Sequence, residues 1–194
     1  PFRGADTDLL TDTLKTDKDG TYYLWRERDS LWTVFLSFDH PSRYRLLDMK
    51  EQVLVEGTLG EGLDGGHLLV KNGQWSEYYK NGTIKSTGYY AANQPLGYWE
   101  YYYPNGVKRK TYQYAKVEWD GREYPLMLGA YEEFYNNGQV KIIGKYTYRI
   151  DTVEAEGVVS SGSEPEIEYV PVTKKAGTWY YYRANGEIFK EEKY

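Results

Sequence analysis

The sequence contains no cysteine and only two histidines, His40 and His67. The absence of cysteine excludes disulfides, thiolate zinc sites and cysteine nucleophiles. The two histidines lie far apart, in stretches typical of turns, so no histidine cluster has metal-ligand spacing. A calcium loop at TDKDG (16–20) is also not expected, because Arg26 stands where its closing glutamate belongs, and no nucleophile-elbow motif is found. We therefore expect no cofactor, no metal site and no catalytic residues.

Long apolar runs are also missing. The best candidates are short stretches such as LWTVFLSF (31–38), well below the roughly 20 residues that span a bilayer. The formal net charge of -5 gives no global attraction to nucleic acid or anionic membrane, although a local basic patch is compatible with it. The chain begins at Pro1, which fits either a removed signal or anchor segment or a trimmed sequence, and a bacterial envelope location is favoured over the cytoplasm.

Aromatic side chains are what the sequence has in excess, with 23 tyrosines and 6 tryptophans among 194 residues. Tyrosine and tryptophan bury their ring bodies while the polar tips stay in water. This composition suits a thin sheet with half-exposed faces better than a thick aliphatic core. No linker divides the chain into separate domains, and its length suits one substantial domain.

Four stretches share one frame: glycine, any residue, an aromatic, and an Asn-Gly pair that ends the stretch. They read GQWSEYYKNG (73–82), GYWEYYYPNG (97–106), GAYEEFYNNG (129–138) and GTWYYYRANG (177–186). In each copy the aromatic precedes the asparagine by six residues. The structural residues of the repeat are therefore Trp75, Trp99, Tyr131 and Trp179, with the turn pairs Asn81–Gly82, Asn105–Gly106, Asn137–Gly138 and Asn185–Gly186.

The copies start 24, 32 and 48 residues apart, which indicates a 24-residue unit with two insertions. We divide the repeat region 73–194 into 73–96, 97–128, 129–152, a decayed copy at 153–176, and 177–194. Asp120–Gly121 in the shorter insertion would lengthen a hairpin without breaking the sheet. Residues 1–72 hold no clean copy and are interpreted as degenerate strands that continue the sheet and cap one end. The opening stretch DTDLLTDTLK (6–15) is compatible with a helix.

Asn-Gly between aromatic runs is a strong hairpin signal, because both central residues of a type I′ turn take a positive φ. Each unit is therefore expected to form strand, tight turn and strand. The predicted fold class is all-β: an elongated, single-layer antiparallel sheet of repeated β-hairpins, in which each unit packs mainly on its neighbours.

Side-chain alternation assigns the residues of each strand to two faces. In 97–106 it places Trp99, Tyr101 and Tyr103 on a packed face, and Tyr98 and Tyr102 on the opposite face.

A two-residue turn also fixes which residues lie opposite one another. On the tryptophan face it pairs Tyr79 with Ile84 and Tyr135 with Val140. On the opposite face it predicts three aromatic–cation pairs that form a ladder, and Tyr182 beside Phe189 at the end. These pairs are our candidates for a binding face: Tyr78 with Lys85, Tyr102 with Arg109, and Phe134 with Lys141.

The frame G-x-W-x-x-Y-Y-x-N-G, followed by a basic residue, resembles the bacterial variant of the MORN repeat, a family that includes YwqK-type antitoxins. The resemblance covers residues 73–194, with Tyr131, Phe134 and Arg183 departing from the pattern. It implies an elongated all-β repeat sheet used for interaction, and it brings no catalytic residues.

The leading functional hypothesis is a non-enzymatic scaffold that binds a protein through the aromatic and basic face or an exposed edge strand. One alternative is carbohydrate binding on the aligned aromatic rings. Others are an antitoxin-like intracellular binder and attachment to anionic lipid through Lys85, Arg109, Lys141, Lys108 and Lys110. Nucleic acid is not expected as a partner, and an enzyme is disfavoured by the lack of catalytic motifs.

Overall fold

The computed structural model describes residues 10–16, 18–27, 30–37, 42–61, 69–154 and 167–194. They form one 14-stranded sheet in which every strand pair is antiparallel. The strands follow one another in chain order, except that β6 pairs with β5 beside β7. This confirms the all-β prediction. The strands are β1 (Leu10–Thr16), β2 (Gly20–Glu27), β3 (Ser30–Ser37), β4 (Ser42–Leu47), β5 (Val53–Glu61), β6 (Leu69–Lys71), β7 (Gly73–Tyr78), β8 (Ile84–Ala91), β9 (Gln94–Tyr102), β10 (Lys108–Trp119), β11 (Arg122–Phe134), β12 (Val140–Glu154), β13 (Ile167–Tyr182) and β14 (Ile188–Lys193).

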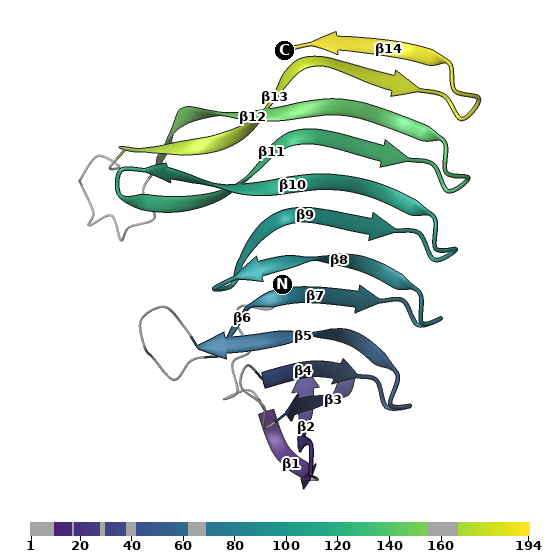
Figure 1. Cartoon of the computed structure of the whole chain (residues 1–194), viewed down its shortest axis with the longest axis vertical. Helices are drawn as coiled ribbons and strands as arrows, with labels where there is room; N and C mark the ends of the chain where they lie inside the picture. The colour runs from purple at the N-terminus through teal and green to yellow at the C-terminus, as the bar shows by residue number, and fades with distance from the viewer. Residues whose placement is uncertain (1–9, 17, 28–29, 38–41, 62–68, 155–166) are drawn as a thin grey trace, which may run out of the picture.

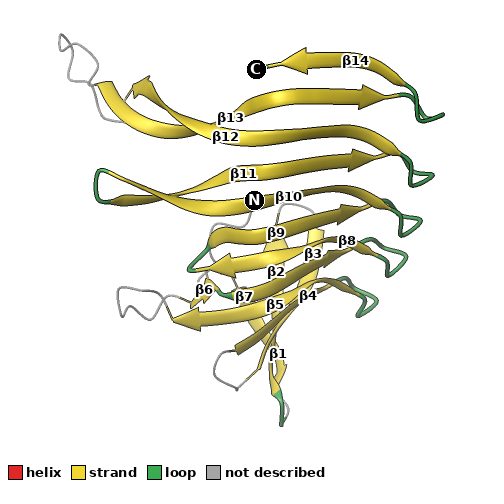
Figure 2. Ribbon diagram, turned by 45° about the horizontal axis from the view of Figure 1, so that its top comes forward, coloured by secondary structure: helices red, strands yellow, loops and turns green. Residues whose placement is uncertain are grey.

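The sheet is elongated, with its strands stacked along the long axis of the molecule (Figure 1). It twists along its length, so that β1–β3 lie at a steep angle to the strands at the other end (Figure 2). The Asn-Gly turns line one long edge, and the long β10–β11 and β12–β13 hairpins project at the other (Figure 1). None of the described residues belongs to a helix that is long and apolar enough to cross a membrane.

The opening segment is a strand where it is described. Residues 6–9 of the stretch expected as a helix lie outside the described residues, and residues 10–15 belong to β1. The helix expectation is wrong there, because β1 pairs with β2 from Leu10 opposite Trp25 to Thr16 opposite Thr21. Pairing with a neighbouring strand overrides the weak local preference.

The Asn-Gly turns are not of the predicted type. In the first one the Gly82 N–H donates to Tyr79 O, and the Tyr79 N–H donates to Thr83 O, both at 2.9 Å. Only the glycine has a positive φ, of 81°, and Asn81 does not. The loop therefore has three residues, 80–82. It forms a type I turn, and the last loop residue, Gly82, adopts the left-handed conformation. The same bonds recur at residues 103–107, 135–139 and 183–187.

The longer loop shifts the register by one residue, which corrects the predicted cross-strand pairs. Tyr78 lies opposite Ile84, and the next pair is Glu77 with Ser86, so Lys85 is the extra residue of a β-bulge. The register shifts in the same way after Tyr102 opposite Lys108, Phe134 opposite Val140 and Tyr182 opposite Ile188.

The turn tyrosines and two of the turn asparagines join neighbouring hairpins. Asn81 accepts a bond from the Thr83 N–H (3.1 Å), and its Nδ2 donates to Pro104 O (2.8 Å) in the next turn. The Tyr79 hydroxyl donates to Tyr102 O at 2.8 Å. Equivalent hydroxyl bonds run from Tyr103 to Phe134 O and from Tyr135 to Tyr182 O. These hydrogen bonds therefore join each repeat unit to the next one.

A further hairpin of the same design lies outside the four predicted copies, at residues 42–61. The Glu51 N–H donates to Asp48 O (3.0 Å) and the Asp48 N–H to Gln52 O (2.9 Å), as in the Asn-Gly turns. Glu51 takes the place of the turn glycine with a φ of 60°. Tyr44 stands where the later copies carry tryptophan or tyrosine, and it lies opposite Gly57.

The core is a row of aromatic rings seated on glycines of the preceding strand. Trp75 covers Gly57, Trp99 covers Gly88 and Trp179 covers Gly144, since a Cβ at each glycine would lie 2.2 Å from the ring above it. In the remaining hairpin two tyrosines replace tryptophan and glycine: Tyr131 stacks on Tyr112, with ring centroids 6.2 Å apart. The row is thus continuous from β4 to β13.

Burial confirms the assignment of the two faces. Trp99 is 7% exposed on the packed side, whereas its neighbour Tyr98 is 71% exposed on the other. At the N-terminal end the row merges with an aliphatic cluster of Val34, Leu46 and Leu59, which packs around Tyr44 and Trp75.

The two insertions lengthen hairpins within the sheet. Asp120 and Gly121, both with positive φ, form the turn between β10 and β11, where Trp119 lies opposite Arg122, and this confirms the lengthened hairpin. The described residues of 153–176 continue β12 and β13, which pair out to Glu154 opposite Ile167. Residues 155–166 of the decayed copy lie outside the described residues.

Candidate interaction surface

The six candidate binding residues are divided between the two faces. Tyr78, Tyr102 and Phe134 lie on the face opposite the tryptophans, as predicted. Their expected partners do not, because the bulge turns Lys85, Arg109 and Lys141 onto the tryptophan face.

On the tryptophan face the three cations have local neighbours. Lys85 forms an ion pair with Glu77 at 3.1 Å, and Lys141 forms one with Glu133 at 2.6 Å. The Arg109 guanidinium lies 5.9 Å from the ring centroid of Tyr101, and its buried Nε has no hydrogen-bond partner. The predicted aromatic–cation ladder on the opposite face is therefore wrong.

A different ladder runs along the opposite face, next to the turns. Each strand pair there places an aromatic ring beside an aliphatic side chain, except that Tyr102 is paired with Lys108. Among the described residues from β7 to β14, no further strand lies over this part of the sheet (Figure 1). Ile84 and Ile188 are 40% and 47% exposed. We call this set the turn-side row: Tyr78, Ile84, Tyr102, Phe134, Val140, Tyr182 and Ile188.

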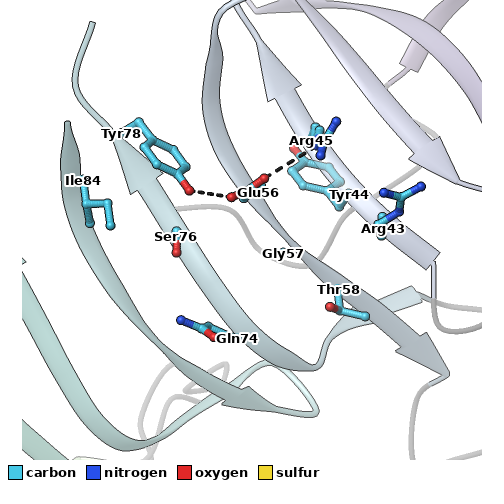
Figure 3. Close-up of a pocket in the computed structure, with 10 residues that line it drawn as sticks. All are labelled: Arg43, Tyr44, Arg45, Glu56, Gly57, Thr58, Gln74, Ser76, Tyr78 and Ile84. Carbon is cyan, nitrogen blue, oxygen red and sulfur yellow. Dashed lines mark hydrogen bonds and ion pairs between the residues drawn. The ribbon is translucent and has the colours of Figure 1, made fainter. Parts of the chain in front are cut away.

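A groove of about 410 Å³ adjoins the N-terminal end of this row, over β4, β5, β7 and β8. Figure 3 shows its centre, where the Tyr78 hydroxyl donates to Glu56 and Arg45 Nε lies 3.6 Å from the other oxygen of that carboxylate. Arg43 also lines the groove. The groove is polar, whereas the row beside it is apolar. The remaining lining residues are Tyr44, Gly57, Thr58, Gln74, Ser76 and Ile84.

Burial and hydrogen bonds hold the tyrosines of this face neutral. Burial and then the bond to Glu56 raise the pKa of Tyr78. Burial, followed by the 2.8 Å bond to Glu100, raises the pKa of Tyr102 to about 12. Glu100 also accepts a bond from Lys108, which holds the pKa of that carboxyl below its usual value. The hydroxyl groups of both tyrosines are thus fixed in position by hydrogen bonds to glutamate side chains.

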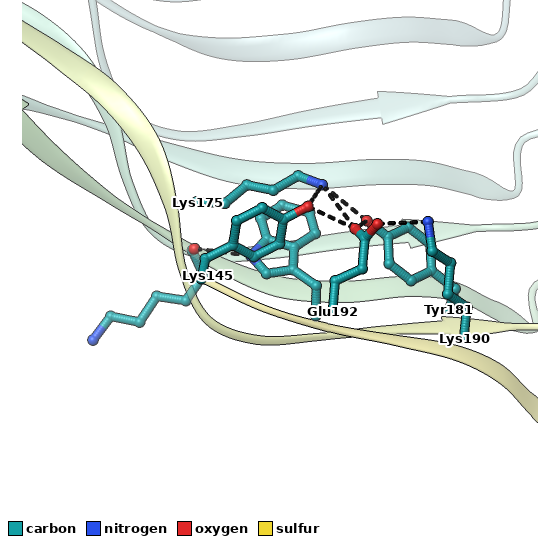
Figure 4. Close-up of polar contacts among 7 residues, drawn as sticks. Lys145, Lys175, Tyr181, Lys190 and Glu192 are labelled. Atoms are coloured by element: carbon teal, nitrogen blue, oxygen red, sulfur yellow. Dashed lines mark hydrogen bonds and ion pairs between the residues drawn. The ribbon is translucent and has the colours of Figure 1, made fainter.

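The tryptophan face ends in a polar cluster at β13 and β14 (Figure 4). Lys175 Nζ lies 4.5 Å from the ring centroid of Trp179 and 2.8 Å from the hydroxyls of both Tyr181 and Tyr194. Glu192 accepts bonds from the same two hydroxyls at 2.6 Å. Glu192 occupies the repeat position that glycine holds in β8 and β12. Polar groups therefore close this end of the row of aromatic rings.

Sequence reasoning missed the groove because Arg43, Arg45 and Glu56 lie in a hairpin without an Asn-Gly pair. A spacing signal was present: glycine follows the frame aromatic by 13 residues in Tyr44–Gly57, as it does in Trp75–Gly88 and Tyr131–Gly144. His40 and His67 lie outside the described residues. Within the described ranges no group of three or more acidic or histidine side chains could hold a metal ion.

Three segments of the chain, 71–92, 95–116 and 127–148, match the family described as MORN repeat variant. Each segment contains one frame aromatic, Trp75, Trp99 or Tyr131, with its turn and the strand that follows. The chain therefore carries MORN-variant repeats over these segments, and the hairpin at 42–61 and the copy at 177–194 lie outside them. No curated protein and no solved structure matches the chain significantly.

Proposed function

We propose that this chain is a non-enzymatic scaffold that binds a partner protein across the face opposite its tryptophans. The observation that carries the proposal is the turn-side row, which aligns aromatic and aliphatic side chains over four successive hairpins. The row is half-buried, with Ile84 and Ile188 exposed, and apolar side chains gathered on a surface mark interaction sites. MORN repeats are in general associated with scaffolds that bind proteins or membrane lipids.

The groove beside Tyr78 supplies the polar part of the proposed interface. Tyrosine and arginine are the side chains that most often dominate binding energy, above all in pockets that exclude water. The hydroxyl, carboxylate and guanidinium groups of Tyr78, Glu56 and Arg45 favour a hydrogen-bonding group on the partner. We therefore propose a partner surface with apolar side chains in line and a polar, hydrogen-bonding side chain at one end.

Two features favour a protein partner on this face over the alternatives. The nominated lysines Lys85, Lys108 and Lys141 are each within salt-bridge distance of a glutamate, which lowers their attraction for anionic lipid. The edge strand β14 carries Lys190, Glu191, Glu192 and Lys193 in succession. Charges of this kind protect sheet edges from pairing with other chains.

The experiment replaces the aliphatic members of the row together, as Ile84→Thr, Val140→Thr and Ile188→Thr. Threonine keeps the β-branch that suits a strand, so the sheet is retained while apolar contact is lost. The triple variant and the wild-type chain are used to capture protein from the native host, and the affinity for the captured partner is measured. We expect the triple variant to bind about tenfold more weakly or worse.

Met49→Gln serves as the matched control, because Met49 is 65% exposed but lies in the β4–β5 turn, outside the row. It should bind like the wild-type chain. Equal binding by all three proteins would contradict the proposal, as would equal losses in the triple variant and in Met49→Gln.

A further inference from the structure

A second surface feature lies at the opposite long edge, where the two lengthened hairpins meet. The Trp119 Nε1–H, at the tip of β10, donates to the carbonyl oxygen of Tyr169 in β13 at 3.0 Å. Arg122 at the start of β11 forms an ion pair with Glu168. The Thr173 hydroxyl donates to Met127 O at 3.3 Å. These contacts join the described parts of the two hairpins, away from the Asn-Gly turns (Figure 1).

Two aromatic rings remain accessible at this junction. Trp119 is 38% exposed and Tyr169 is 62% exposed, although each lies at the end of a well-paired strand. Together with Asp120 and Glu168 they line a cleft of about 570 Å³. Clefts of about 300–1,000 Å³ are the usual size for small-molecule ligands.

Asp120 lines the cleft from the turn that closes the β10–β11 hairpin. Asp120 has a φ of 49° and Gly121 a φ of 70°, so the pair forms the tight turn that closes the β10–β11 hairpin. Among the described residues the Asp120 side chain has neither an ion pair nor a hydrogen bond, whereas the Glu168 carboxylate is paired with Arg122. The cleft is therefore lined by two aromatic residues, by the unpaired Asp120, and by Glu168, whose partner Arg122 is not a lining residue.

We propose that this cleft binds a saccharide. The C–H face of a pyranose ring packs on the flat faces of tryptophan and tyrosine, and its hydroxyls both donate to carboxylates and accept from guanidinium groups. The indole plane of Trp119 is fixed by its bond to Tyr169 O, so it is preorganised as a platform. A cationic ligand suits the cleft less well, because Arg122 already neutralises Glu168.

The saccharide site is independent of the proposed protein scaffold. The cleft lies on the edge away from the turns, and it shares no residue with the turn-side row or its groove. Its residues come from the two insertions rather than from the repeat frame, so the inference concerns what this chain adds to its repeats.

The test measures the binding of chitohexaose, cellohexaose, maltohexaose, mannohexaose and galactohexaose to the whole chain by calorimetry and tryptophan fluorescence. We expect at least one of them to bind at millimolar or lower concentration and to change the tryptophan emission of the chain. Tyr169→Ala leaves the carbonyl bonded to Trp119 in place, and it should weaken binding about tenfold or more. Asp120→Asn should weaken binding severalfold, because it removes the carboxylate. The turn is retained, since asparagine tolerates the same positive φ.

Tyr148→Ala is the matched control, because Tyr148 is an exposed β12 aromatic that does not line the cleft, and it should bind normally. Lack of binding by every saccharide overturns the proposal, and so does binding that survives both cleft substitutions. Displacement of the bound sugar by tetramethylammonium, with the same residue dependence, would assign the cleft to cations instead. The triple row variant should keep its saccharide binding, which separates failure here from failure of the scaffold proposal.

Discussion

The indole ring of Trp99 lies against the backbone of Gly88, so that a Cβ atom on Gly88 would stand 2.2 Å from Cδ2 of the ring. Gly88 has no positive φ, and the requirement for glycine is therefore steric. We expect Gly88→Ala to lower the free energy of unfolding by about 1–3 kcal/mol, because the buried Trp99 ring must move to make room for the added methyl group. Urea unfolding followed by circular dichroism measures the change.

Gly60→Ala is the control for this substitution. Gly60 is also buried without a positive φ, but its Cβ would meet only the flexible Asn72 side chain, at 3.1 Å. Gly60→Ala should lower the free energy of unfolding clearly less than Gly88→Ala does. Equal decreases in the two variants would contradict the steric explanation.

The turn of the unpredicted hairpin at 42–61 carries a residue that its backbone does not favour. Glu51 has a φ of 60°, where the Asn-Gly turns have glycine, and its side chain is exposed. The left-handed conformation destabilises a non-glycine residue by about 1–2 kcal/mol. Glycine avoids this strain, but its greater freedom in the unfolded state offsets part of the gain. We expect Glu51→Gly to stabilise the chain by about 0.5–1 kcal/mol. Thermal unfolding measures the gain, which Glu51→Ala should not reproduce.

The tyrosine hydroxyls of the turns are expected to contribute to stability between hairpins. The Tyr103 hydroxyl donates to Phe134 O at 2.9 Å, across a hairpin boundary. Tyr103→Phe removes this bond alone, and we expect it to lower the free energy of unfolding by about 0.5–1.5 kcal/mol. Tyr98→Phe, at a ring that is mostly exposed and forms no such bond, should leave the unfolding midpoint unchanged. If both substitutions have the same effect, the hydroxyl does not join the hairpins.

The fold could be predicted from the sequence because its frame is local: Trp75 and Asn81 recur at a fixed distance in later copies, and alternation sorts Tyr98 from Trp99. The register could not, because Asn-Gly by itself favours a two-residue turn. Asn81 instead bonds to Pro104 O in the neighbouring turn, an interaction that a rule based on one hairpin does not include.

The candidate surface was predicted only in part for the same reason. A one-residue change of register exchanges the faces beyond the turn, so Tyr102 was assigned correctly while Arg109 was not. The hairpin at 42–61 was not predicted, because it contains no Asn-Gly pair. Tyr44 and Gly57 nevertheless keep the spacing of the repeat. The aromatic–glycine spacing is the signal that remains in this hairpin, where the Asn-Gly pair is absent.

Tyr102 should make the stability of the chain fall at alkaline pH. Its folded pKa, raised to about 12, lies above the usual value of 10.0, so the folded state retains this proton when the unfolded state has lost it. The stabilisation is complete below about pH 10 and is lost as the pH rises towards 12. We therefore expect the wild-type chain to lose more unfolding free energy between neutral pH and about pH 11 than Tyr102→Phe does. Glu100→Gln, which removes the ionised acceptor but leaves the burial of the ring, should reduce the alkaline loss in part, and an equal loss in all three proteins would show that Tyr102 does not retain its proton in the folded state.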